Sequence, residues 1–272
     1  MLFRSQLLAL YFNVLPLPKA VNLLKQGKLP SRAVSIIFDD GYADNYTNAL
    51  PILQKYNLHA TFFIASGYLD GGRMWNDTII ETIRVLEKPE LDLEAIHLGK
   101  FDISTPDKKV LVVNEVLQKL KHLAPEVRQE YSDYIKEQAH AASEPLMMTT
   151  EQLKALHKSG MEIGGHTVTH PIMAKLTDDQ VKNEILVNKN TLEQILETKL
   201  RCFAYPNGKY YLDFLPTQIE LVKACGYELA VTTEWGVADR NTDLWQLPRF
   251  TPWDNSPLKF IARMAQMFLS AK

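Results

Sequence analysis

Short apolar runs alternate with amphipathic helical patterns along most of this 272-residue chain. The runs lie at residues 33–38, 59–65, 161–163, 201–205 and 227–231. Strands of a parallel sheet are buried on both faces, so they read as continuous apolar segments, and helices connect them. The alternation therefore predicts an α/β fold in which helices wrap a parallel sheet. Single α/β barrels reach this length.

The alternation of apolar runs with helical patterns is less regular between about residues 70 and 148. Stretches such as 109–121 and 125–140 have helical character, and no clear strands accompany them. We expect one domain over residues 1–272 that carries a largely helical insertion at about 70–148. Loops that follow the strands of a barrel tolerate such insertions, so we expect it on that face.

The composition excludes several classes of partner. The formal net charge is -2, and no run of Lys and Arg is dense enough to follow a phosphate backbone, so we expect no nucleic-acid partner. No segment reaches the roughly 18 apolar residues of a membrane span, so we expect no transmembrane segment. We expect Cys202 and Cys225 to be core thiols, although a bridge between them stays open.

The N-terminal segment has the order of a short signal peptide, with Arg4 before the apolar residues 7–12. Asn13, Pro16 and Pro18 interrupt the apolar run, and no small-x-small cleavage site follows it cleanly. We therefore expect this segment to belong to the mature protein and the protein to be cytoplasmic. Membrane association and export are the alternatives.

Two adjacent carboxylates directly follow the first buried run. Phe38-Asp39-Asp40-Gly41 places them where a strand-ending loop opens toward ligands. A divalent cation lets neighbouring carboxylates stay ionised together, because without it their repulsion raises the pKa of one of them. Asp40-Gly41 is also an ordinary turn dipeptide, so the pair is either a cation site or a turn.

Two histidines, His166 and His170, lie four residues apart after the strand expected at residues 161–163. If the segment turns helically, both imidazoles lie on one side of it. Two imidazoles and a carboxylate can bind a divalent ion and leave positions open for water and substrate. Such a pair also arises by coincidence. The ends of parallel strands converge on one face of an α/β fold, so the two motifs together favour a metal site.

A third motif, Phe-Ala-Tyr-Pro-Asn-Gly at residues 203–208, completes a series. Asp39-Asp40-Gly41, the His166-Thr-x-x-His170 element and this motif occur in the order and roughly the spacing of the polysaccharide deacetylase family, also called the NodB-homology family or carbohydrate esterase family 4. The chain resembles that family from about residue 32 to residue 249. The resemblance implies a distorted (β/α) barrel, in which the helical insertion is the least familiar part.

The resemblance also implies a role for each motif residue. Asp39 is then the general base, and Asp40, His166 and His170 bind a divalent ion, usually Zn²⁺, with Co²⁺ or Ni²⁺ as alternatives. The backbone N–H of Asn207 occupies the place of an oxyanion donor. These groups suit amide hydrolysis, which needs a Lewis acid for the carbonyl, a base for the attacking water and a donor for the oxyanion.

The chain departs from the family pattern in two places. Many members carry an Arg in the third motif that pairs with the catalytic Asp, and a Tyr before the Gly, where this chain has Ala204 and Asn207. Arg249, after the expected last strand, is our candidate for the missing cation, and the alternative is a surface arginine. The family's late Leu-x-His motif is absent, since no histidine follows His170. The leaving amine then takes its proton from Asp39 or from another acid.

Aromatic rings often form sugar-binding surfaces. Trp75, near the start of the insertion, is our first candidate for a substrate contact, and Tyr205 and Pro206 of the third motif are the next. The alternative for Trp75 is a core role, which is commoner for tryptophan. Other rings available for stacking are Trp235, Trp245 and Trp253.

We therefore expect a metal-dependent hydrolase that removes an acetyl group from an N-acetylhexosamine unit of a glycan or glycan precursor. Its expected partner is a carbohydrate that contains an N-acetylated sugar, and the sequence indicates no oligomeric state. One alternative is removal of a formyl group, or of another amide, at the same metal site. Another is a carbohydrate-binding protein with little catalysis, although binding alone needs no base such as Asp39.

Overall fold

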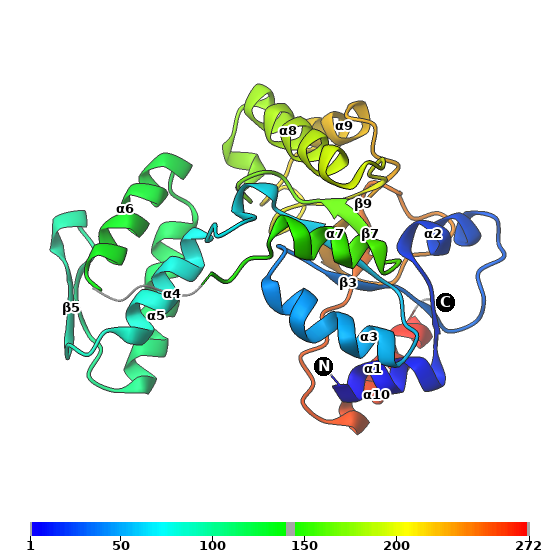
Figure 1. Cartoon of the computed structure of the whole chain (residues 1–272), viewed down its shortest axis with the longest axis horizontal. Coiled ribbons are helices and arrows are strands. Elements are labelled where there is room, and N and C mark those ends of the chain that lie inside the picture. The colour runs from blue at the N-terminus through cyan, green and yellow to red at the C-terminus, as the bar shows by residue number, and fades with distance from the viewer. Residues whose placement is uncertain (1, 140–144, 271–272) are drawn as a thin grey trace. The chain divides into compact units, whose positions relative to one another are not determined.

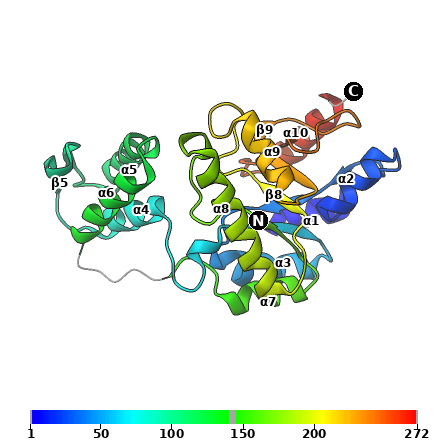
Figure 2. The ribbon, with the colours of Figure 1, turned by 90° about the horizontal axis from the view of Figure 1, so that it is seen from above.

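The computed structural model describes residues 2–139 and 145–270. The chain divides into two compact units. The first unit combines Met1–Gly71 with Met147–Lys272, and the second is Gly72–Leu146. Figure 1 and Figure 2 show both units in colours that follow the chain.

The first unit is built on a six-stranded parallel sheet with the strand order β10-β9-β8-β7-β4-β3. Its strands are β3 (Ile36–Phe38), β4 (Ala60–Ile64), β7 (Glu162–Gly165), β8 (Cys202–Ala204), β9 (Leu229–Trp235) and β10 (Leu247–Arg249). A short parallel pair, β1 (Asn13–Val14) and β2 (Ala33–Val34), precedes it. The predicted α/β class is confirmed, and the sheet curls into a half-barrel (Figure 1).

Helices cover the sheet of the first unit. They are α1 (Leu2–Tyr11), α2 (Leu17–Lys25), α3 (Leu50–Lys55), α7 (Thr150–Lys158), α8 (Asp178–Leu196), α9 (Pro216–Ala224) and α10 (Pro257–Ser270). Both α7 and α8 begin with a capping box, in which Thr149 pairs with Gln152 and Thr177 with Gln180. Each box satisfies backbone N–H groups that a helix leaves without a partner at its start.

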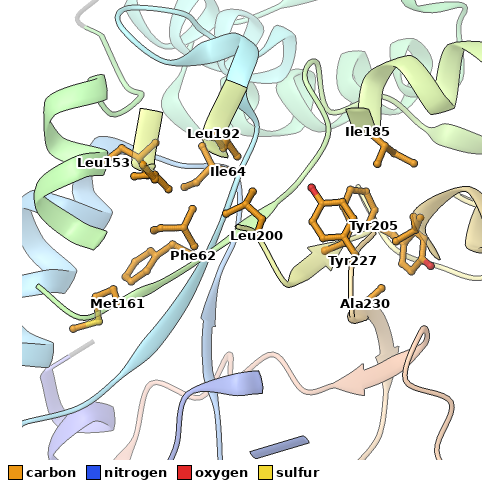
Figure 3. Close-up of a cluster of buried hydrophobic side chains, with 14 of the residues drawn as sticks. Phe62, Ile64, Leu153, Met161, Ile185, Leu192, Leu200, Tyr205, Tyr227 and Ala230 are labelled. Carbon is orange, nitrogen blue, oxygen red and sulfur yellow. The ribbon is translucent and has the colours of Figure 1, made fainter. Parts of the chain in front are cut away.

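Two buried clusters cover the two faces of the sheet. The outer cluster fills the space between the sheet and helices α7, α8 and α9, and Figure 3 shows part of it. The inner cluster lies on the opposite face, where Leu17 and Val21 of α2 join residues of the strands. Phe62 of β4 belongs to the outer cluster and Phe63 to the inner one. This is the alternation of a strand that is buried on both faces.

The second unit contains α4 (Trp75–Val85), β5 (Glu90–Leu93), β6 (Gly99–Asp102), α5 (Pro106–Lys121) and α6 (Pro125–Glu137). It has a buried cluster of its own, formed between the helices and the hairpin. The unit is mostly helical, as predicted, but the prediction of no clear strands was wrong. In β5 the buried Leu91 and Leu93 alternate with exposed acidic residues, a pattern too short to stand out in the sequence. His140, at the end of the helix predicted over residues 125–140, lies outside the described residues.

The chain leaves the first unit after Gly71 and re-enters it at Met147, and Asp70 and Met148 are the neighbouring residues on the first unit's side. The backbone N–H of Asp70 donates to the Met148 carbonyl, with 3.1 Å between N and O. The Asp70 carboxylate accepts hydrogen bonds from both the backbone N–H and the hydroxyl of Thr150. These bonds lower the pKa of Asp70. They hold the two ends of the insertion together within the first unit.

Cys202 and Cys225 are buried free thiols, as predicted. Burial raises the pKa of the Cys202 thiol, so it stays protonated in the core. Among the helices that the structure describes, none combines the length and the apolar character that a bilayer crossing requires.

Candidate active site

Asp39 and Asp40 follow β3 at its carboxyl end. Ile37 of β3 packs on the inner cluster, and Asp39, two residues further, continues that face. Asp40 has a left-handed backbone, with φ 75°, so the extended conformation of the strand does not continue through this residue. A residue other than glycine adopts this conformation only when its surroundings stabilise it. The two adjacent carboxylates therefore have different neighbours.

Asp40 lies against the two histidines that the sequence analysis paired with it. Its Oδ1 is 3.3 Å from Nε2 of His166 and 3.4 Å from Nε2 of His170. His166 follows β7 directly and is 1% exposed, whereas His170 is 19% exposed. One ligand atom from each of the three residues lies within 4.8 Å of the others. A carboxylate oxygen and two imidazole nitrogens at this spacing fit a divalent ion.

The His166 ring is oriented by the third motif. Its Nδ1 lies 2.7 Å from the Ala204 carbonyl, at the carboxyl end of β8. When Nδ1–H donates to this carbonyl, the lone pair of Nε2 faces Asp40, which is the tautomer that a metal ligand requires. The family's arginine position, occupied here by Ala204, thus contributes to the site through its backbone.

The charges around Asp40 favour a cation. Burial raises the pKa of Asp40, but the contact with His166 and the positive potentials of His170 and Arg249 lower it. These effects together exceed the effect of burial, so the net shift is downward. Burial lowers the pKa of His166, and the carboxylates of Asp40 and Asp39 raise it above its ordinary value. The site therefore stabilises positive charge beside an ionised carboxylate, as a divalent ion requires.

Arg249 ends β10 and binds the other carboxylate. Its two terminal nitrogens are 2.9 Å from Oδ1 and 2.8 Å from Oδ2 of Asp39, so the pair is bidentate. The Arg249 side chain is 15% exposed and the Asp39 side chain 29%. A planar guanidinium in this geometry fixes the orientation of the carboxylate. The structure thus brings Arg249 to the position where the sequence analysis expected a cation.

Two residues of α8, Glu184 and Asn188, hold the loop that carries the histidines. The Glu184 carboxylate accepts hydrogen bonds from the backbone N–H groups of Val168 and Thr169. The fully buried Asn188 accepts from the backbone N–H of His166 and donates to the carbonyls of Ile64 and Thr167 and to the Ser66 hydroxyl. These bonds tie the end of β7 to the end of β4.

The sequence analysis missed both residues of α8, although one signal was present. Asn188 lies seven residues after Val181 and four before Leu192, and both of those side chains are fully buried in the outer cluster. An asparagine at a helix position that otherwise carries apolar residues indicates a buried hydrogen-bond network.

We expect Asn188→Ala to weaken divalent-ion binding about 10- to 100-fold, because groups that orient metal ligands have effects of this size. The change should also lower the free energy of unfolding by about 2–4 kcal/mol, since it leaves buried donors and acceptors without partners. Titration calorimetry with Zn²⁺ and chemical denaturation measure the two effects. Asn190→Ala is the matched control, because Asn190 is an exposed asparagine of the same helix. Equal ion affinity in the two variants would contradict the assigned role.

The third motif forms a tight turn after β8. Asn207 and Gly208 both have left-handed backbones, with φ 58° and 76°. The Thr233 hydroxyl donates to the Asn207 carbonyl, and the Thr233 N–H donates to the Gly208 carbonyl. A Cβ at Gly208 would lie 2.8 Å from the Thr233 nitrogen, so only glycine fits. The turn is thereby anchored to β9 and keeps Asn207 half-buried at the strand ends.

The prediction that the Tyr205 ring contacts substrate is wrong. Tyr205 has no exposed surface, and its ring stacks on Phe214 with 3.8 Å between the centroids. Figure 3 shows the ring within the outer cluster. Tyr205 lies two residues after Phe203, which belongs to the same cluster, so alternation directs both rings toward the helices. Pro206 is also buried, which leaves its side chain little surface for a ligand.

We expect Tyr205→Phe to raise the free energy of unfolding by about 1 kcal/mol. The hydroxyl is buried, and no partner for it occurs among the described residues, so its removal relieves a desolvation cost. Burial also raises the pKa of this phenol, so the hydroxyl stays protonated at neutral pH. Thermal denaturation measures the effect. A loss of stability together with a loss of turnover would instead indicate that the hydroxyl serves the site.

Trp75 belongs to the second unit, where it begins α4. The guanidinium of Arg128 lies 4.9 Å from the centre of its ring, and the Ser132 hydroxyl donates to its carbonyl. Trp75 thus packs within its own unit, and its contact with substrate stays a prediction. Among the other tryptophans, Trp245 is partly buried on the outer cluster, while Trp235 and Trp253 are 56% and 81% exposed.

Comparison with known proteins agrees with this architecture. The chain is 26% identical to YxkH of Bacillus subtilis over 234 residues, which are 85% of this chain and 56% of that protein. It is also 26% identical over 176 residues to poly-beta-1,6-N-acetyl-D-glucosamine N-deacetylase of Staphylococcus aureus, which covers 64% of this chain and 60% of that protein. The chain therefore spans less than two thirds of the length of these curated relatives.

The fold is shared with a solved structure. The Streptococcus pyogenes deacetylase PplD in complex with acetate superposes with a TM-score of 0.62 at 22% identity, and the match covers 97% of this chain and 85% of that one. The family model described as polysaccharide deacetylase matches residues 26–93 and 113–230, which are more than half of the chain. The chain belongs to the polysaccharide deacetylase family.

Proposed function

We propose that this chain is a metal-dependent hydrolase that removes the acetyl group from an N-acetylhexosamine unit of a glycan or glycan precursor. The observation that carries the proposal is the division of labour between two adjacent carboxylates. Asp40 lies with His166 and His170 in a metal-type ligand set, while Asp39 stays outside it in a bidentate pair with Arg249. A protein that only binds carbohydrate has no need of an oriented base beside the metal.

The proposed reaction adds water to the acetamido carbonyl and breaks the carbon–nitrogen bond, which yields acetate and a free amine. Asp40, His166 and His170 would hold the ion, for which we propose Zn²⁺, with Co²⁺ or Ni²⁺ as alternatives. Such an ion polarises the carbonyl and lowers the pKa of water. Asp39 accepts the proton of the attacking water and then carries it to the leaving nitrogen. Arg249 keeps the Asp39 carboxylate in one orientation throughout.

The third motif completes the proposed machinery. Thr233 holds the carbonyls of Asn207 and Gly208, which fixes the turn that presents the Asn207 backbone N–H. We assign this N–H to the oxyanion that develops on the acetyl carbon. The substrate class is supported by the name of the Staphylococcus aureus relative, which acts on a poly-N-acetylglucosamine. The cytoplasmic location stays a prediction.

Release of acetate from β-1,6-linked N-acetylglucosamine oligosaccharides tests the proposal. The protein is stripped with a chelator, reloaded with Zn²⁺, Co²⁺ or Ni²⁺, and assayed for acetate and for new primary amine. We expect activity only in the reloaded samples. N-formylated sugars are assayed in parallel, and faster release of formate than of acetate would favour the deformylase alternative. Glycan binding without release of either acid would indicate a carbohydrate-binding protein.

A further inference from the structure

Trp235 is a large aromatic residue at the carboxyl end of β9, and its role is not explained by the fold. It is 56% exposed, although the four residues at the start of the strand are all buried. All strands of this sheet are parallel, so β9 ends at the same end of the sheet as β3 and β10, which lead to Asp39 and Arg249. An exposed indole at the carboxyl ends of the strands is available to a ligand in the site.

The strand register places Trp235 beside Arg249. The two residues are direct partners in the pairing of β9 with β10. Leu247 and Val231 form the preceding pair, and the register shifts between the two pairs. Leu247 and Val231 belong to the inner cluster. Arg249 lies two residues beyond Leu247, and its side chain reaches Asp39 on the inner face. Side chains of directly paired residues lie on the same face of a sheet, so the register puts Trp235 on this face as well. Asp39 continues the same face from β3.

Two contacts hold the end of β9 in place. The Trp235 ring meets Phe250 edge-on, with 5.0 Å between the centroids and an interplanar angle of 86°. At the next residue the chain runs close to β10, since a Cβ at Gly236 would lie 3.1 Å from the Pro248 Cβ. Phe250 directly follows Arg249, so the aromatic pair is fixed to the same strand as the arginine that orients Asp39. The indole is therefore a supported ring with more than half of its surface exposed.

We propose that Trp235 is a stacking platform for a pyranose ring of the glycan. The apolar C–H face of a sugar ring packs well on an indole, whose rigid surface costs little conformational entropy to order. Arg249 extends from the backbone position paired with Trp235 to the Asp39 carboxylate, so the length of an arginine side chain lies between that backbone position and the base. The stacked ring is therefore the neighbour of the unit that loses its acetyl group, and the enzyme prefers an oligosaccharide to a single sugar. This inference rests on the proposed deacetylase function.

The test compares N-acetylglucosamine with its β-1,6-linked trimer as substrates of the Zn²⁺-loaded protein. We expect Trp235→Ala to raise the KM for the trimer about tenfold, with a smaller change in kcat, because a stacking contact binds the ground state and the transition state alike. The KM for the single sugar should change much less. Trp235→Phe should recover part of the loss, since it keeps an aromatic face.

Tyr11→Ala is the matched control. Tyr11 is a 51% exposed aromatic residue that ends α1, just before β1. The partner of β1 is β2, which precedes β3 in the chain, so Tyr11 lies toward the amino end of β3 and Asp39 at its carboxyl end. Its removal should leave the KM values of both substrates unchanged.

The outcomes separate the platform from the proposed function. If the wild-type protein deacetylates the trimer and Trp235→Ala has no effect, or affects both substrates equally, the platform is wrong and the function stands. If the wild-type protein releases no acetate, fluorescence titration with the trimer decides. Binding that Trp235→Ala weakens supports the platform without the function, and binding that is absent or unchanged overturns it.

Discussion

Asp39→Asn is expected to lower kcat for acetate release by about 10²- to 10⁴-fold, the range that a positioned general base contributes. Asparagine has nearly the size of aspartate, but it cannot accept the proton of the attacking water. The measurement is initial-rate acetate release from the trimer by the Zn²⁺-loaded variant. Divalent-ion affinity should change little, because Asp39 lies outside the set formed by Asp40, His166 and His170.

Arg249→Ala distinguishes the proposed role of the Asp39 carboxylate as base from the role of Arg249 in orienting it. This variant keeps the carboxylate and removes the guanidinium that binds both of its oxygens. Loss of orientation alone can cost about 100-fold in rate, so we expect more residual activity in Arg249→Ala than in Asp39→Asn. Asp39→Asn with near wild-type turnover would exclude Asp39 as the base, and the proposed mechanism would need another acceptor for the proton.

His166→Ala is expected to weaken Zn²⁺ binding by at least about 100-fold and to abolish turnover, because it removes one of the three proposed protein ligands. Bound metal is measured by atomic emission after dialysis, and affinity by competition with a chromophoric chelator. His166 is 1% exposed, so its removal also leaves a cavity. His170→Ala is the second variant, since the proposed ligand His170 is 19% exposed and its loss disturbs packing less.

His122→Ala is the control for ion binding, because His122 is an exposed histidine at the end of α5 in the other unit. It should bind Zn²⁺ like the wild-type protein. If a folded His170→Ala variant also bound Zn²⁺ with wild-type affinity, the assignment of the ligand set would be incorrect. Circular dichroism establishes whether each variant is folded.

The sequence predicted those parts of the site that depend on position along a strand. Asp40 and His166 each follow an apolar run, and parallel strands bring their carboxyl ends together whatever the details of packing. Arg249 is 210 residues from Asp39, yet the same rule placed it at the strand ends. The spacing of two histidines and the position of a residue after an apolar run are both visible in a short stretch of sequence, so a single sequence is enough to recognise them.

Other features depend on packing that a single sequence does not display. Tyr205 lies in an entirely apolar run, and such a run does not reveal which residues face the helices and which face the inner cluster. The β5–β6 hairpin alternates over only a few residues. Asn188 is recognisable in retrospect, but its partners are Ile64 at the end of β4 and Thr167 in the loop after β7, and only the complete fold brings them together.

The bonds of Asp70 to Met148 and Thr150 have a consequence for how the chain can vary. They close the insertion as a loop whose two ends belong to the first unit, and the insertion has a core of its own. The entropy cost of closing a flexible loop grows only with the logarithm of its length, by about 0.6 kcal/mol for each doubling. Descendants of this gene can therefore lengthen, shorten or replace the insertion at little thermodynamic cost to the half-barrel.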